Sequence, residues 1–252
     1  MENLLQMDQV EVVAVMDPME ECREYARERK IPHIVNTYDE LLVVAPFDSV
    51  VICSPTDTHA DYVEMAAKAG IHVFCESYIK QSGGLFLDMT IHDFDMARFV
   101  VGKEIEEVYA KGAVLVDPAI GEAGDIDTAV VTLTYTDGTM AVIDNSREAA
   151  YGYDQRIEVF GSKGMAQADN NYEDSHRLYT GKGIQGSLPL HFFLERYAAA
   201  YKSEMASYVT SLKNGDAMEV DGTDGLRSLQ IGLAAIKSLR EKRPVKIEEI
   251  GN

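Results

Sequence analysis

Two carboxylates and a histidine recur at helical spacing near the middle of the chain, and together they have the groups needed for proton transfer. Asp88, His92 and Asp95 are spaced four and three residues apart, which places them on one face of a helix that begins after Gly83-Gly84. An imidazole titrates near neutral pH, and a carboxylate one turn away can fix its tautomer or stabilise its cation. The spacing therefore indicates a site that moves a proton.

The same three residues have two plainer interpretations. They can form a solvated helix face, or they can be ligands of a divalent metal. A metal site is disfavoured because the three positions span two helical turns, too far to reach one ion without another element. The apolar runs 83–87 and 96–100 indicate a largely buried helix, in which ionisable groups need a reason to be present. We therefore predict no bound metal.

The elements before this helix alternate between strand and helix. Residues 10–17, 49–55 and 71–76 are apolar, β-rich runs, and residues 18–30 and 56–69 have helical composition. Strands that are apolar on both faces and alternate with helices are typical of a parallel sheet covered on both sides. The first part of the chain is therefore predicted to be Rossmann-like.

The second part has the pattern of an antiparallel sheet with helices. Asp137-Gly138 joins two apolar runs and predicts a hairpin, which a strand at 156–160 continues. Further expected elements are a strand at 165–168, helices at 191–212 and 223–241, and a last strand at 244–247. The predicted fold class is α/β plus α+β: an incomplete Rossmann-like parallel sheet in a domain of residues 1–77, then a mainly antiparallel sheet with helices in residues 78–252.

Composition limits the possible partners. The 252 residues include 23 Lys and Arg against 42 Asp and Glu, a net charge of −19, and 46% of them are hydrophobic. Such a chain repels phosphate backbones and anionic lipid, so we expect no nucleic-acid or membrane binding. No apolar run approaches the length of a membrane-spanning helix. Three cysteines without Cys-x-x-Cys spacing indicate no disulfide framework and favour the reducing cytoplasm.

Four segments resemble the Gfo/Idh/MocA family of NAD(P)-dependent oxidoreductases, and most closely its inositol 2-dehydrogenase-like members. They are residues 12–17, 52–59, 72–76 and 83–95, and the likeness continues through 156–164 to the last helix. The resemblance implies an enzyme that oxidises a hydroxyl of a small polyol or sugar by transferring hydride to the nicotinamide of NAD.

The resemblance also assigns residues to the cofactor. Asp17 is similar to the acid that binds the adenosine ribose, which favours NAD over NADP. A helix N-cap is the plainer interpretation of this residue. The other implied cofactor-binding residues are Ser54, Pro55, Thr56 and His59, in the turn beneath the nicotinamide, and Glu76. For the turn, the alternative is a strand ended by proline and followed by a capped helix.

On the substrate side, His92 matches the family's histidine that takes the hydroxyl proton, and Asp88 matches the aspartate that positions it. Tyr151 and Tyr153 are candidates for contacting a polyol, although tyrosines packed on the sheet are an alternative. The resemblance further implies a homo-oligomer formed through the open face of the antiparallel sheet, where Val130 to Val142 is apolar.

The chain also departs from the family pattern. In the family pattern, an opening strand and a phosphate-binding Gly-x-Gly-x-x-Gly turn would come before Met1. The same Gly-x-Gly-x-x-Gly pattern occurs at Gly181–Gly186, but Ser-Leu-Pro follows it where a phosphate-binding turn would be followed by a helix. Ser77 stands where the family has the lysine of Glu-Lys-Pro. About sixty residues, two βαβ-sized portions, are expected to be missing between Ser77 and Tyr78.

The missing segments predict a gap in the parallel sheet, and they also leave open the hypothesis that the chain is not an active enzyme. In the strand order 3-2-1-4-5-6 the missing first strand lies between the strands that end at Asp17 and Pro55, so those two strands lose their shared neighbour. The alternative to an active dehydrogenase is a catalytically inactive, truncated relative that acts as an assembly module, or that arises from an incomplete gene model.

Overall fold

The computed structural model describes residues 1–55, 58–76 and 83–251. Its internal contacts divide the chain into two units, Met1–Ser82 with Tyr201–Glu219, and Gly83–Ala200 with Val220–Asn252. The sequence predicts one continuous second domain, residues 78–252, and the structure differs for 201–219. This segment groups with the first unit because Tyr208 is hydrogen-bonded to Ser49 at 2.5 Å and packs edge-on against Phe74.

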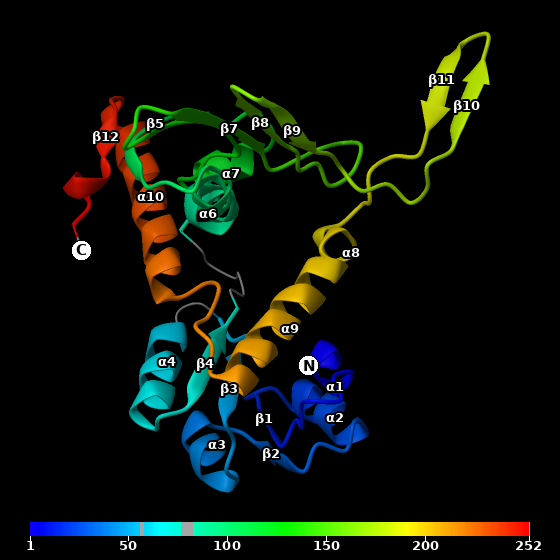
Figure 1. Ribbon diagram of the computed structural model, residues 1–252, viewed down its shortest axis with the longest axis vertical. Coiled ribbons are helices and arrows are strands. Elements are labelled where there is room, and N and C mark those ends of the chain that lie inside the picture. The colour runs from blue at the N-terminus through cyan, green and yellow to red at the C-terminus, as the bar shows by residue number, and fades with distance from the viewer. Residues whose placement is uncertain (56–57, 77–82, 252) are drawn as a thin grey trace. The chain divides into compact units, whose positions relative to one another are not determined.

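The first unit has two pairs of parallel strands and the helices that follow them (Figure 1). β1 pairs with β2 in the register Ala14↔His33, and β3 pairs with β4 in the register Ser49↔His72. Within the described residues no ladder joins β1 to β3, in agreement with the expected gap in the sheet. The elements are α1 (Glu2–Leu5), β1 (Ala14–Met16), α2 (Glu20–Glu28), β2 (His33–Val35), α3 (Tyr38–Val44), β3 (Ser49–Ile52), α4 (His59–Lys68) and β4 (His72–Cys75).

Local sequence explains how α3 and α4 are held against these strands. The Thr37 hydroxyl accepts a hydrogen bond from the Glu40 amide, and the Glu40 carboxylate accepts one from the Thr37 amide, which is a reciprocal N-terminal cap. Tyr38 then stacks on Tyr62 of α4 with ring centroids 4.5 Å apart. The buried core of this unit consists of Tyr38, Leu41, Val50, Ile52 and Ala66.

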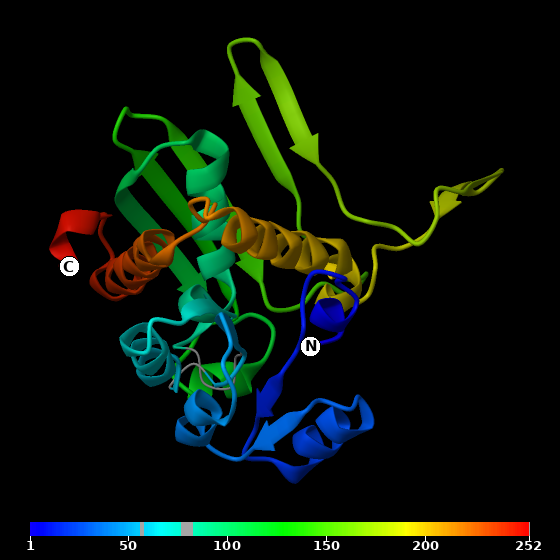
Figure 2. The same ribbon diagram turned by 60° about the horizontal axis from the view of Figure 1, so that its bottom comes forward.

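The second unit is built on a four-stranded antiparallel sheet in the order β12-β5-β6-β7. Alternate residues of β6, such as Val131 and Leu133, are fully buried in a core that also contains residues of α6 and α10. The two helices lie along one side of the sheet (Figure 2). Val130 and Val142 lie on the opposite, open face of the sheet and are exposed. The elements are α5 (Leu85–Asp88), α6 (Thr90–Val101), β5 (Ile105–Ala113), α7 (Pro118–Glu122), β6 (Thr128–Tyr135), β7 (Met140–Ser146), α10 (Gly222–Glu241), β12 (Val245–Lys246) and η2 (Ile247–Glu249).

Two hairpins follow the main sheet. β8 (Ile157–Gly161) and β9 (Gly164–Ala168) form their own two-stranded sheet, so the expectation that residues 156–160 continue the main sheet is wrong. β10 (Arg177–Thr180) and β11 (Gly183–Gly186) form a second one. The Gly181–Gly186 motif supplies the turn and the second strand of that hairpin rather than the start of a helix.

The long helix expected at 191–212 is divided. α8 (Phe193–Arg196) ends at Tyr197, and α9 (Ala198–Asn214) continues from the second unit into the first. The long helix expected at 223–241 is confirmed as α10, and a capping box formed by Asp221 and Asp224 marks its start. In the part of the chain that the structure describes, no helix is both long and apolar enough to cross a membrane.

Candidate active site

The helix expected after Gly83-Gly84 is interrupted at Met89. α5 ends at Asp88, Met89 has φ −113° and ψ −56°, and α6 begins at Thr90. The prediction that Asp88, His92 and Asp95 share one face of a continuous helix is therefore wrong. The three side chains have different surroundings.

Asp88 is anchored by an arginine from the end of the sheet. Arg147, which directly follows β7, donates from Nη1 to Oδ2 of Asp88 across 2.9 Å and from Nη2 to Oδ2 of Asp125 across 3.2 Å. Asp125 also accepts the Leu85 amide at 3.1 Å, so its carboxylate caps the start of α5. The guanidinium therefore holds both ends of this one-turn helix through two carboxylates.

The close approach of Asp125 requires a glycine at the start of α5. Gly84 has φ +83°, and a Cβ atom at this position would lie 2.5 Å from Oδ1 of Asp125. Both the backbone angle and the space therefore exclude an ordinary side chain. The Gly83-Gly84 turn predicted from the sequence is confirmed, and its second glycine makes room for a carboxylate.

His92 lies in the first turn of α6 and is exposed. Within the described residues its imidazole has no hydrogen-bond partner, and Asp88 is paired with Arg147 instead. The expected steering of His92 by Asp88 is not present in this structure, because the break at Met89 separates the two residues into different helices.

Asp93, the residue after His92, is the centre of a polar network that the sequence did not indicate. Its Oδ2 accepts from the Asn145 amide at 3.0 Å, and its Oδ1 accepts from the Gln155 amide at 3.1 Å. The buried Thr90 hydroxyl donates to Asn145 at 2.7 Å. Asp93 thereby fixes the loop after β7 to the start of α6.

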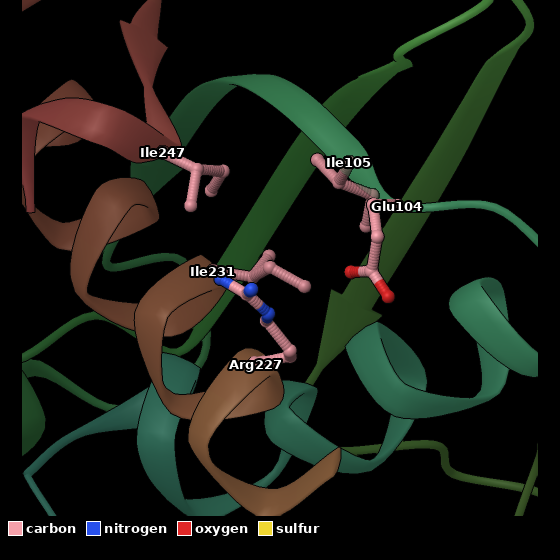
Figure 3. Close-up of a pocket in the computed structure, with 5 residues that line it drawn as sticks. All are labelled: Glu104, Ile105, Arg227, Ile231 and Ile247. Atoms are coloured by element: carbon pink, nitrogen blue, oxygen red, sulfur yellow. The ribbon is translucent and has the colours of Figure 1, made fainter. Parts of the chain in front are cut away.

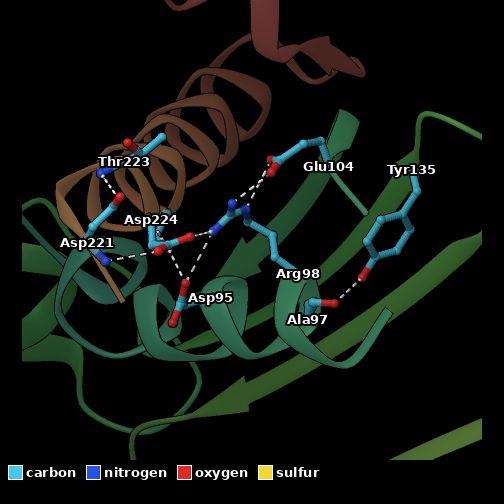
Figure 4. A network of polar contacts seen from close by, with 9 residues as sticks. Asp95, Ala97, Arg98, Glu104, Tyr135, Asp221, Thr223 and Asp224 are labelled. Carbon is cyan, nitrogen blue, oxygen red and sulfur yellow. Dashed lines mark hydrogen bonds and ion pairs between the residues drawn. The ribbon is translucent and has the colours of Figure 1, made fainter. Parts of the chain in front are cut away.

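Asp95 belongs to a structural cluster around Arg98 rather than to a proton-transfer site (Figure 4). Arg98 pairs with Asp95, with Asp224 of α10 at 3.2 Å and with Glu104 at 2.7 Å. The Glu104 carboxylate is the main cause of a raised pKa for Arg98. The partners of Asp88 and Asp95 thus differ, and the described residues contain no group of three His, Cys, Asp or Glu side chains placed to hold a metal.

The two candidate tyrosines have different surroundings. Tyr153 packs edge-on against Tyr197 with centroids 5.7 Å apart, and burial raises the pKa of both phenols. The Asp93 carboxylate makes a smaller contribution to both shifts. The hydroxyl of Tyr151, an exposed residue, is instead hydrogen-bonded to Asp154.

The candidate cofactor residues of the first unit lie where parallel strands end. Asp17 follows β1, and its Oδ1 accepts the Met19 amide at 2.8 Å in the turn before α2. The N-cap of α2 is Met19, so the N-cap interpretation of Asp17 is wrong, and its carboxylate closes the turn before the helix. Burial, and then a hydrogen bond to this carboxylate, raise the pKa of the Cys22 thiol. Glu76 follows β4, and its amide donates to Ile52 at 2.8 Å.

The turn between β3 and α4 is closed by its own side chains. The Ser54 and Thr58 hydroxyls are 2.6 Å apart, and Nε2 of His59 is 2.6 Å from the Ser54 carbonyl. Thr58 also donates to the Pro55 carbonyl at 2.7 Å. Thr56, also predicted to bind the cofactor, lies outside the described residues, as does Ser77.

These residues fit a dinucleotide in one specific respect. Ligands of open parallel sheets bind outside the carboxyl ends of the strands, and an acid near the end of a strand binds a ribose hydroxyl. Asp17, Ser54 and Glu76 all follow strand ends in this way, and the Asp17 carboxylate can accept further hydrogen bonds besides the one from the Met19 amide. The second unit contains a cavity of about 120 Å³ (Figure 3). It is lined by Glu104, Ile105, Arg227, Ile231 and Ile247, and none of these is a predicted site residue.

Comparison with known proteins shows which family each part of the chain matches. Residues 1–77 match the oxidoreductase family with an NAD-binding Rossmann fold, and residues 73–167 match the GFO/IDH/MocA C-terminal domain. The chain is 40% identical to myo-inositol 2-dehydrogenase of Thermotoga maritima, covering 99% of this chain and 95% of the relative. The chain belongs to the Gfo/Idh/MocA family of oxidoreductases. The NAD-binding Rossmann fold and the antiparallel domain predicted from the sequence are thereby confirmed.

Other Gfo/Idh/MocA proteins show the same similarity. Inositol 2-dehydrogenase of Rhizobium meliloti is 39% identical over 84% of each chain. The crystal structure of a probable dehydrogenase from Thermotoga maritima has a TM-score of 0.95 and 40% identity, covering 99% of this chain and 95% of its own.

The Gfo/Idh/MocA alignment also shows that this chain lacks part of what its relative has. The alignment with the T. maritima protein has 316 positions, and this chain has only 252 residues. At least 64 residues of the relative therefore have no counterpart in this chain. This number agrees with the expected absence of about sixty residues.

Proposed function

We propose that the chain is an NAD-dependent dehydrogenase that oxidises a ring hydroxyl of an inositol or a related polyol or sugar. The observation that carries this proposal is the exposed imidazole of His92 at the start of α6, the helix that follows α5, whose last residue Asp88 is held by Arg147. The names of the relatives, inositol 2-dehydrogenases, support a polyol substrate.

In this proposal the protein's residues have distinct roles. His92 accepts the proton of the hydroxyl that is oxidised, because a neutral imidazole is a base near neutral pH. Asp88, with one oxygen engaged by Arg147, presents the other to a substrate hydroxyl. Tyr153 contacts a further hydroxyl of the substrate. Bound NAD supplies a nicotinamide that accepts hydride.

The residues proposed to hold NAD lie in the first unit. Asp17 binds the adenosine ribose through its carboxylate and disfavours the extra phosphate of NADP, because two negative groups would meet there. The other residues assigned to the cofactor are Ser54, Pro55, Thr56, His59 and Glu76.

We also propose a cytoplasmic homo-oligomer. The three cysteines are free thiols, which suits a reducing compartment. The open face of the main sheet exposes Val130, Met140 and Val142 side by side, and paired sheet faces of this kind bury apolar area in symmetric dimers.

Titration of the purified chain with NADH, followed by its fluorescence, tests the cofactor, and NAD reduction with myo-inositol, scyllo-inositol and glucose tests the substrate class. We expect NADH binding at micromolar concentrations and turnover with at least one inositol. Binding without turnover of any polyol would overturn the substrate assignment. Absence of NADH binding would instead favour the inactive assembly module.

A further inference from the structure

Asp93 joins the helix that carries the proposed base to the loop that carries Tyr153. The base, His92, directly precedes Asp93 on α6. The side-chain amide of Gln155, two residues after Tyr153, donates to Oδ1 of Asp93 across 3.1 Å. One hydrogen bond therefore links the element that bears the proposed proton acceptor to the segment that bears a proposed substrate contact, and both belong to the second unit.

The orientation of the Asp93 carboxylate is fixed from the interior of this unit. Asn145 of β7 donates to its Oδ2 across 3.0 Å, and the fully buried Thr90 hydroxyl donates to Oδ1 of Asn145 across 2.7 Å. An amide has one accepting and one donating side, so the bond from Thr90 makes the NH₂ group of Asn145 face Asp93. Asn145 is itself held in the main sheet by its pairing with Ala129. The second carboxylate oxygen is thereby directed at Gln155.

The Tyr153 loop is held from its other side by Asn170, which is only 8% exposed. The Asn170 side chain accepts the backbone amide of Gln155 across 2.8 Å and donates to the carboxylate of the preceding residue across 2.7 Å. The Tyr153 amide donates to the Leu190 carbonyl across 2.9 Å. The loop is therefore an ordered segment, and its bond to Asp93 fixes it relative to α6.

We propose that Asp93 is a positioning residue, which sets the distance between His92 and Tyr153 and thereby determines which ring hydroxyl of a polyol is oxidised. A polyol carries several hydroxyls of similar reactivity, so selection among them depends on how the ring is held. With His92 at the reacting hydroxyl and Tyr153 at another, a fixed separation favours one orientation of the ring. This inference rests on the proposed function and adds to it a residue that acts through its neighbours.

The values of kcat/KM for myo-inositol and scyllo-inositol test the inference, because these isomers differ in the orientation of one hydroxyl. In Asp93→Ala and in Gln155→Ala we expect the better of the two substrates to lose about tenfold more kcat/KM than the poorer one. The expected fall in kcat for the better substrate is about 10- to 100-fold, the effect of a misplacement of about 1 Å. The double variant should resemble each single variant, because all three lose the same bond.

Asp93→Asn separates the position of this side chain from its charge. Asparagine can accept from Asn145 through Oδ1 and, once the Gln155 amide has turned over, donate to the Gln155 oxygen. Both hydrogen bonds are then kept while the negative charge beside His92 is lost. We therefore expect Asp93→Asn to retain the selectivity of the unchanged enzyme.

Asp95→Ala is the matched control, because it removes another carboxylate of α6, one that accepts from the Ser228 hydroxyl across 3.1 Å. We expect this variant to have a lower unfolding temperature and the same preference between the two inositols as the unchanged enzyme. Thermal unfolding followed by circular dichroism verifies that every variant folds.

The possible outcomes distinguish this inference from the proposed function. The positioning role is overturned, and the dehydrogenase retained, if the alanine variants keep the preference of the unchanged enzyme or if Asp93→Asn behaves like Asp93→Ala. A control that loses selectivity as the Asp93 variant does has the same consequence. An unchanged chain that oxidises no polyol overturns the proposed function and this inference together.

Discussion

Arg147 donates from Nη1 to Oδ2 of Asp88 across 2.9 Å, and this contact links the residue after β7 to the last residue of α5. The same guanidinium reaches Asp125, so one side chain fixes two carboxylates that are distant in the sequence. The geometry of the proposed proton-transfer site therefore depends on a residue outside the helix that carries it.

Replacement of Arg147 by alanine is expected to lower the free energy of unfolding by about 1–2 kcal/mol, because two partly buried carboxylates lose their charged donor. Urea denaturation followed by circular dichroism measures this. Arg156→Ala removes an exposed arginine paired with Asp154 and should cost less. Equal losses for the two variants would contradict a special role for Arg147.

Gly84→Ala should be more destabilising than Gly124→Ala. Both glycines have φ near +80°, but a Cβ atom at Gly84 meets Asp125, whereas at Gly124 it meets nothing within 4 Å. We expect a cost of about 1 kcal/mol for the backbone angle alone at Gly124 and about 2–3 kcal/mol at Gly84. Thermal unfolding of the two variants compares them, and similar midpoints would argue against the carboxylate contact.

Glu204 of α9 should make the stability of the first unit depend on pH. Burial, and then the neighbouring Glu76 carboxylate, raise the pKa of Glu204 from 4.5 to about 7. A carboxyl group whose pKa is raised on folding favours the folded state while it stays protonated, so its contribution falls as pH rises from about 4.5 to 7. We expect Glu204→Gln to raise the unfolding temperature more at pH 8 than at pH 5. A gain that is the same at both pH values would contradict the raised pKa.

His92→Asn should reduce the rate of polyol oxidation by about 10²- to 10⁴-fold, the range associated with loss of a general base. NADH affinity should remain within about twofold, because His92 belongs to a unit other than the one that carries the proposed cofactor residues. Steady-state kinetics and fluorescence titration of the same preparation separate the two effects. A variant that retains full kcat would exclude His92 as the base.

Tyr153→Phe should raise the KM for the polyol about tenfold, through loss of one hydrogen bond to a substrate hydroxyl. Tyr151→Phe serves as the comparison, since the Tyr151 hydroxyl is already bonded to Asp154. The assignment of Tyr153 to the substrate fails if both variants have the KM of the unchanged enzyme.

Much of the fold was accessible from local sequence patterns. The apolar runs at 49–55 and 71–76 became β3 and β4, and Asp137-Gly138 formed the hairpin between β6 and β7 with Gly138 at φ +84°. Short or charged strands escaped detection: β2 has only three residues, and β5 carries Glu106 and Glu107 near its start. Periodicity is weak in such segments, and pairing with a neighbour decides their conformation.

The candidate site was less predictable because its contacts are long-range. Arg147 lies 59 residues from Asp88, and the partners of Asp93 lie 52 and 62 residues away. A helical spacing argument assumes a continuous helix, and the single irregular residue Met89 invalidated it. Only the three-dimensional structure shows which carboxylate each donor reaches.

The separation of β1–β2 from β3–β4 determines how the first unit can come apart. Because the described residues share no ladder across this boundary, either pair can open without breaking a backbone hydrogen bond of the other. Cooperativity between the two halves then rests on side-chain packing alone. Amide exchange in His33–Val35 and in His72–Cys75 would accordingly proceed through separate opening events rather than one shared transition.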